Sequence, residues 1–165
     1  QGTMYVENGK VTRALDTFDP DATDLRIDPE ALARFILASA LNDDFRPEAF
    51  LASFACPSDG FGFSLTNGND EPIYINIVKA SRKAEGGYDI SPLGQPVGSY
   101  VLLPGQTIAR SQPQIPESYE KHILIATHYF CAIDDLVESL RKAAADPGTE
   151  GAPVPALPVF IAHIR

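Results

Sequence analysis

The chain has 165 residues, of which 44% are hydrophobic and 21% are charged, a balance typical of one globular domain. Its net charge is -9, with 13 basic residues against 22 acidic ones, and it lacks the clustered lysines and arginines of a nucleic-acid-binding surface. No apolar run approaches the roughly 20 residues that a membrane-spanning helix requires. We therefore expect neither nucleic acid as a partner nor a membrane span.

The sequence predicts the limits of the domain and a turn near its N-terminus. Residues 1–3 look like a cloning remnant, so we expect one domain over residues 4–165. Within it, we expect a hairpin and a helical pair over 4–58 and a β-sandwich with one C-terminal helix over 59–165. Asn8-Gly9, between two short apolar segments, predicts the N-terminal hairpin.

Two helices are predicted next. The motif DPE at residues 28–30 supplies an N-cap, a proline at the first helical position and an acid in the first turn. Apolar residues recur at helical spacing after it, which predicts an amphipathic helix over 29–41. Pro47 predicts the start of a second short helix, with Phe50 and Phe54 on one face.

From Phe61 onward the apolar residues alternate with a period of about two, as in β-strands. Glycine and proline separate the alternating segments, as turns do in β-sandwiches. An apolar stripe from Ile133 to Leu140 predicts a third helix, which should end near Ala145. The fold class is therefore expected to be α+β, mainly β, with about three accessory helices. The predicted strands are 61–66, 72–80, 86–90, 99–103, 106–110, 121–130 and 158–164.

The stretch "FSLTNGNDEPIYINIVKA", residues 63–80, has two alternating segments around a polar turn. This pattern predicts a β-hairpin. Alternation also assigns the faces of its second strand. Ile75 and Ile77 should face the core, and Tyr74 and Asn76 should face outward or a neighbouring helix.

Cys56, in "FACPSDG", is the first candidate catalytic residue. A cysteine can act as a nucleophile when a histidine base lies beside it in the fold, but no histidine of this chain lies in a recognisable catalytic motif. The other reading, which we favour, is a small buried hydrophobic residue. Cys56 and Cys131 are expected to be free thiols, although the sequence also permits a disulfide between them.

Metal and cofactor sites are weakly supported. His122 and His128 would share one face of a strand but lie roughly 20 Å apart at about 3.3 Å per residue, too far to bind one ion. Cys131 completes no standard zinc motif with them. The oxygen-rich "NGNDE" turn at 67–71 permits calcium, but such a composition usually marks only a turn. We expect no metal and no cofactor.

The order of motifs from 61 to 140 resembles a known family. The segments are "FGFSLTNGNDEPIYINIVKA", "YDISPLG", "VLLPGQTIA" and "YEKHILIATHYFCAIDDLVESL". Together they resemble the domain of unknown function that is found C-terminal to bacterial caspase-like (family C14, metacaspase-like) peptidases. The resemblance implies an immunoglobulin-like antiparallel β-sandwich that carries no catalytic residues, appended to a peptidase with a His–Cys dyad. Around Cys56 the chain departs from the "D-x-C-x-S-G" motif of that dyad, so the dyad is not carried over.

The resemblance implies a non-catalytic accessory or interaction domain of a larger bacterial protein, whose partner is a protein or the parent peptidase domain. The sequence does not assign its compartment, which could be the cytoplasm or the periplasm. Turns on such a scaffold are the expected contact sites. A cysteine hydrolase that uses Cys56 is one alternative. A small-ligand or carbohydrate-binding module that uses exposed Tyr74, Tyr88 and Tyr100 is another. The candidate contact residues are Asn67, Asn69, Asp70, Tyr74, Gln95 and Tyr100.

Overall fold

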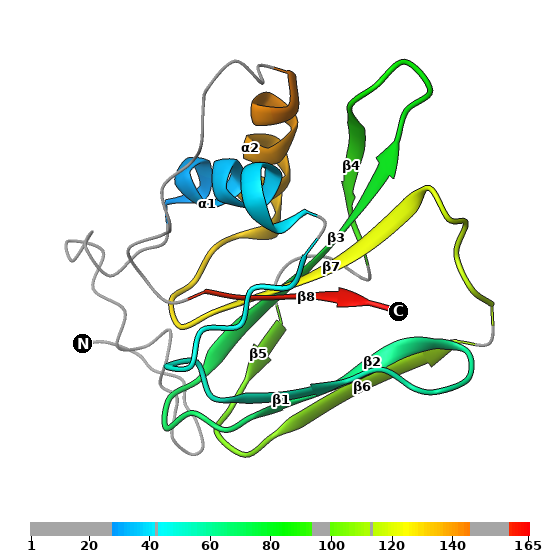
Figure 1. Ribbon diagram of the computed structural model, residues 1–165. Helices are drawn as coiled ribbons and strands as arrows, with labels where there is room; N and C mark the ends of the chain where they lie inside the picture. Colours follow the sequence, from blue (N-terminus) through cyan, green and yellow to red (C-terminus); the bar gives the residue numbers. More distant parts are fainter. Residues whose placement is uncertain (1–27, 42, 94–99, 113, 146–158) are drawn as a thin grey trace.

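The structure is a computed structural model, and it describes residues 28–41, 43–93, 100–112, 114–145 and 159–165. These residues form a mainly β fold with two antiparallel sheets and two α-helices (Figure 1). The helices are α1 (Pro29–Phe35), which continues into a π-helical turn (Ile36–Ala40), and α2 (Ile133–Ala145). The strands are β1 (Ala52–Ala55), β2 (Phe61–Asn67), β3 (Ile73–Arg82), β4 (Tyr88–Pro92), β5 (Tyr100–Leu102), β6 (Thr107–Gln112), β7 (Glu120–Thr127) and β8 (Val159–Ile164).

The elements are stacked in three layers. One sheet has the strand order β1-β2-β6, and the other has the order β4-β3-β7-β8, with β5 paired to the same edge of β3 as β4. The smaller sheet packs on one face of the larger sheet, and the two helices pack on the opposite face (Figure 1). No helix in the described ranges is long and apolar enough to cross a bilayer.

Because the larger sheet lies in the middle, both of its faces are buried, and alternate residues of each strand belong to different cores. In β3, Ile75 and Ile77 face the smaller sheet, whereas Val78 and Ala80 face the helices. Tyr74 and Asn76 share the face of Val78, and the Asn76 side chain donates to the Cys131 carbonyl at 2.9 Å. The prediction for the faces of this strand is confirmed, with the helical layer as the neighbour of Asn76.

Both α-helices agree with their sequence signals. The Asp28 carboxylate accepts a hydrogen bond from the Glu30 backbone N–H at 3.1 Å, with Pro29 in the first turn of α1. The π-helical turn then extends the buried stripe to Ala40, close to the predicted end. In α2, the buried side chains are Ile133, Leu136, Val137 and Leu140, which is the predicted stripe.

The helix predicted from Pro47 is wrong. Residues 47–50 form a turn in which the Phe50 N–H donates to the Pro47 carbonyl, and the chain then enters β1. The physical reason is that a spacing of four residues, as between Phe50 and Phe54, fits one helical turn and also fits two periods of a strand. Pairing of β1 with β2 decides between them, since it satisfies the backbone of Ala52–Ala55 in a ladder.

The hairpin predicted for residues 63–80 is also wrong, although both of its strands exist. β2 pairs with β1 and β6, whereas β3 pairs with β4, β5 and β7, so the two strands lie in different sheets. Phe63 and Leu65 face Ile75 across the sandwich and belong to the same core. The polar turn therefore carries the chain from one sheet to the other.

All seven strand segments predicted from alternation are strands, with β7 ending at Thr127 rather than at residue 130. β1 is the strand that was missed. The N-terminal hairpin, residues 1–3 and the loop over 147–158 lie outside the described residues.

Candidate functional site

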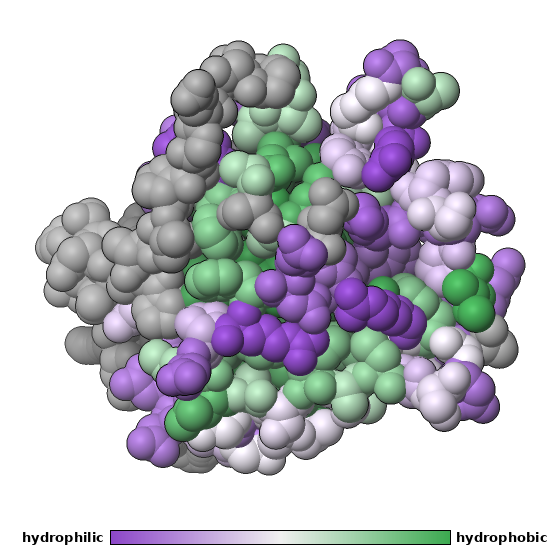
Figure 2. Space-filling view, in the orientation of Figure 1, coloured by the Kyte–Doolittle hydropathy of each residue, from purple (hydrophilic) through white to green (hydrophobic). Residues whose placement is uncertain are grey.

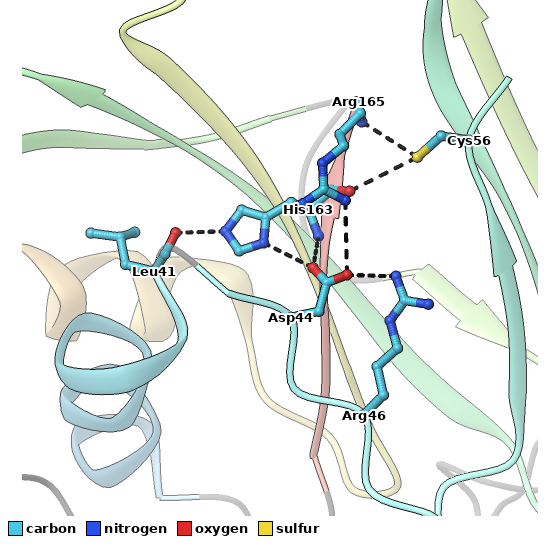
Figure 3. A network of polar contacts seen from close by, with 6 residues as sticks. All are labelled: Leu41, Asp44, Arg46, Cys56, His163 and Arg165. Carbon is cyan, nitrogen blue, oxygen red and sulfur yellow. Dashed lines mark hydrogen bonds and ion pairs between the residues drawn. The ribbon is translucent and has the colours of Figure 1, made fainter. Parts of the chain in front are cut away.

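The most extensive contact between ionisable side chains in the described residues joins β8 to the segment that follows α1. Alternation in β8 places His163 on the face that Val159 and Ile161 turn toward the helices. His163 is only 7% exposed. The Asp44 carboxylate accepts from both the backbone N–H and the ring Nδ1 of His163, at 2.9 Å each (Figure 3). The ring Nε2 bonds to the Leu41 carbonyl. Both ring nitrogens are therefore occupied.

Asp44 also contacts two arginines. Arg46 Nη2 lies 2.8 Å from its Oδ2, and Arg165 Nη1 lies 3.8 Å from the same oxygen. Burial alone would raise the pKa of the Asp44 carboxyl, but the two hydrogen bonds from His163 and the charges of both arginines outweigh burial and lower it. Asp44 is thus an ionised acceptor at neutral pH.

The segment that carries Asp44 covers the outer edge of β8. Phe45 and Ile161 exchange backbone hydrogen bonds of 2.9 and 2.7 Å, as residues of paired strands do. Hydrophilic residues form a band across the middle of the face on which β8 ends (Figure 2). The cluster of Asp44, Arg46, His163 and Arg165 thus fastens this segment to the sheet.

Cys56 lies near this cluster, but it is not paired with the imidazole. Its sulfur is 3.9 Å from the His163 backbone carbonyl and accepts from the Arg165 backbone N–H at 3.4 Å. The imidazole contacts Asp44 and Leu41 instead (Figure 3). A cysteine nucleophile requires a base within hydrogen-bond reach of the sulfur. The geometry therefore does not form a Cys–His dyad.

Both cysteines are free thiols, as expected, and they occupy different places. Cys131 belongs to the core between the larger sheet and the helices. Burial raises the pKa of the Cys131 thiol to about 12, with Asp135 and Asp28 adding to the shift. A thiol with so high a pKa is a poor nucleophile at neutral pH.

The histidines on and after β7 do not form a metal site. Among the described residues, no group of three or more histidine, cysteine or acidic side chains is placed to hold a metal ion. His122 lies edge-on to the Phe61 ring, and its Nε2 is 3.4 Å from a Glu120 oxygen. Burial lowers the pKa of His122, and it also lowers the pKa of His128, which packs against Phe50.

The candidate contact residues of the 67–71 turn are mostly internal. Asn67 is 0% exposed, and its amide donates to the Glu71 and Leu102 carbonyls at 2.9 Å each. Asn69 is 7% exposed and exchanges two hydrogen bonds with the Leu51 backbone. These two residues are corrected from surface contacts to structural residues, because their side chains satisfy the backbone where the chain changes sheets. Oxygens used in this way do not form a calcium cage.

The remaining candidates differ in exposure. Asp70 is exposed, and Gln95 lies outside the described residues. Tyr74 is only 6% exposed and packs edge-on against Phe130, so its expected role as an exposed contact is wrong. Tyr100 is half-buried and accepts a hydrogen bond from Arg110. Tyr88 is half-buried and packs against the core beside the helices, so the three tyrosines expected to bind a small ligand do not form an exposed surface.

The pairing of Asp44 with His163 was missed in the sequence, since the two residues are 119 positions apart. One signal was present. His163 stands in the otherwise apolar segment "VFIAHI", on the face of Val159 and Ile161. A polar side chain on a buried face requires a hydrogen-bond partner, although alternation cannot name that partner.

Comparison with protein-family models, curated proteins and solved structures finds no match to this chain.

Proposed function

We propose that this chain is a non-catalytic interaction domain of a larger bacterial protein. The observation that carries this proposal is the use of the candidate catalytic groups for structure. The His163 imidazole is held by Asp44 and the Leu41 carbonyl, and the Cys56 sulfur meets backbone groups. Groups arranged in this way stabilise a scaffold and are not positioned to move protons to or from a substrate.

The strand order supports an immunoglobulin-like sandwich. If the strands are lettered as in immunoglobulin domains, β1, β2 and β6 take the places of A, B and E, and β4, β3, β7 and β8 take those of C′, C, F and G. Three features depart from that pattern. β5 stands between β4 and β6 in the chain, where strand D would lie, but it pairs with β3 in the larger sheet and not with β6. α2 is inserted between β7 and β8, and neither β2 nor β7 contains the cysteine of the inter-sheet disulfide.

The expected parent is a caspase-like peptidase, and the support for it is the order of motifs in the sequence. This part is tested by the coding sequence next to this region. A preceding domain with a His–Cys dyad supports the proposal, and an unrelated neighbour argues against the peptidase as parent. The acidic balance of the chain favours a protein partner over nucleic acid.

The non-catalytic role is tested with purified wild type and the Cys56→Ala variant. Both are incubated with a panel of peptides that contain arginine, lysine or aspartate. We expect no cleavage by either protein, and slow reaction of Cys56 with a thiol-directed electrophile at neutral pH. Cleavage by the wild type that the variant lacks would overturn the proposal in favour of a cysteine hydrolase.

A further inference from the structure

The edges of the two sheets differ in how they are protected. The outer edge of β8 pairs with Phe45, and Arg141 Nε of α2 donates to the Ile90 carbonyl of β4 at 2.9 Å. β1 has only four residues and is followed closely by Pro57. Unpaired edge strands are places where another chain can add a strand, and protein folds usually block them. β6 is the exception among these edges.

β6 pairs with β2 along all six of its residues and has no strand on its other side in the described structure. The ladder fixes which backbone groups are used. The Asn67 N–H donates to the Gln106 carbonyl, so every second residue from 106 onward bonds to β2. Thr107, Ala109 and Ser111 therefore direct their N–H and C=O groups away from β2. Within the described residues, no backbone hydrogen bond outside the strand ladders involves these three residues.

The side chains of β6 add a chemical preference to this edge. Ile108 packs against the sandwich core, and Arg110 and Gln112 share its face. The Arg110 guanidinium lies over the Tyr100 ring, 4.8 Å from its centroid, and donates to the Tyr100 hydroxyl. Arg110 is exposed, is the one charged residue of β6, and forms no ion pair with a carboxylate of the described residues.

We propose that the free edge of β6 binds an extended peptide segment of another protein, which adds as an antiparallel strand and carries an acidic side chain opposite Arg110. Opposite residues that do not share backbone hydrogen bonds have the closest side chains, and on this edge the position facing Arg110 is of that kind. On the same face of the added strand, the residue two positions further along lies opposite Ile108, and an apolar side chain suits that position. In the direction of the partner chain, the acid therefore precedes the apolar residue by two positions.

This inference rests on the proposed interaction role and names its surface and partner chemistry. A second copy of the chain is a poorer occupant, because symmetric pairing centred on Arg110 would oppose two guanidinium groups, which repel each other. The acidic strand instead provides the carboxylate that Arg110 does not find among the described residues. Backbone hydrogen bonds would give affinity, and Arg110 with Ile108 would give sequence preference.

The probe is a capped peptide of about nine residues. Every second residue is threonine, and the residues between the threonines are serine, glutamate and valine, in that order. The matched control peptide has lysine in place of the glutamate. Isotope-labelled domain is titrated with each peptide, backbone amide shifts are followed by nuclear magnetic resonance, and affinity is measured by fluorescence anisotropy. We expect saturable shifts at Thr107, Ala109 and Ser111, and about fivefold weaker binding of the lysine peptide.

Two variants separate backbone pairing from charge. Ala109→Pro removes an outward N–H without touching the β2 ladder and should weaken binding about tenfold or more. Arg110→Glu should reverse the preference, so that the lysine peptide binds better, whereas Arg82→Glu on the other sheet should leave the preference unchanged. A urea unfolding curve for each variant verifies that the fold is retained.

The inference would be overturned if millimolar peptide caused no chemical-shift change at the amides of Thr107, Ala109 and Ser111. It would also be overturned if Ala109→Pro bound the peptide as tightly as the wild type does. A dimeric wild type that Ala109→Pro converts to a monomer would also overturn it, because a second copy would then be the occupant. None of these outcomes bears on hydrolysis. Cleavage of the peptide panel that depends on Cys56 would overturn the proposed function without deciding whether the β6 edge binds a strand.

Discussion

Replacement of Asn67 by alanine is the sharpest test of how the chain passes from one sheet to the other. The side chain makes four hydrogen bonds, two from its amide to the carbonyls of Glu71 and Leu102 and two to its oxygen from the backbone and side chain of Asn69. Alanine would remove all four and leave their partners unsatisfied in a region that water does not reach freely. Buried groups that lose a partner in this way destabilise the folded state.

The magnitude can be worked from these contacts. A hydrogen bond contributes about 1 kcal/mol net, so the loss of four should lower the free energy of unfolding by about 4 kcal/mol. Because a domain of this kind is stable by about 5–15 kcal/mol, the variant should still fold. With a urea dependence of about 2 kcal/mol per molar, the unfolding midpoint should fall by about 2 M.

Asp70→Ala is the matched control, since Asp70 belongs to the same turn but is exposed. The free energy of unfolding of Asp70→Ala should differ from that of the wild type by no more than about 0.5 kcal/mol. Urea unfolding of the two variants and the wild type is followed by circular dichroism at neutral pH. If Asn67→Ala and Asp70→Ala are equally stable, the Asn67 network does not hold the crossing between the sheets, and the reasoning is refuted.

Gly62→Ala should destabilise the domain by at least about 3 kcal/mol, because an added Cβ would lie 2.1 Å from the Arg110 carbonyl oxygen. A wild-type urea midpoint for this variant would contradict the close approach of β2 and β6. Asp44→Ala should cost about 3 kcal/mol, since it leaves the backbone N–H and Nδ1 of His163 without their charged acceptor, and a loss under about 1 kcal/mol in urea unfolding would argue against the cluster as a fastening. Burial lowers the pKa of His122 below 6.5, so its contribution to stability is complete above pH 6.5 and declines below it, where the unfolded chain takes up the proton first. His122→Gln should therefore reduce the loss of stability between about pH 7.5 and about pH 5.5, and an unchanged loss would contradict this.

The sequence predicts the elements of this fold better than it predicts how they pair. Alternation located β2 and β3 correctly, because the faces of a strand are encoded in neighbouring residues. It could not assign their partners, since two strands that face each other across a sandwich have the same alternation as two strands of a hairpin. The spacing of Phe50 and Phe54 was ambiguous for a related reason. Period and register are local, whereas the choice of sheet depends on contacts far along the chain.

The candidate site was less predictable than the fold. His163 stands out in β8 as a polar residue on an apolar face, yet its partner Asp44 lies in a segment whose course depends on α1 and on pairing with β8. Cys56 attracted attention by residue type, although its contacts are to backbone groups. Reactive side chains can be found by type, but the base or acceptor beside them depends on the tertiary fold.

Four of the six buried polar side chains in the described residues share one task, which bears on where function can lie. Asn67, Asn69, Asn76 and His163 each bond to a backbone carbonyl of a turn or connection, namely those of Glu71, Leu51, Cys131 and Leu41. Such bonds satisfy the irregular backbone that sheet ladders leave unpaired and fix the route of the chain between layers. These four side chains are therefore committed to the chain's connections and are not available to bind a substrate. We therefore expect recognition at backbone N–H and C=O groups that form no hydrogen bond within the domain. In the described structure, such groups lie in a row along the outer edge of β6.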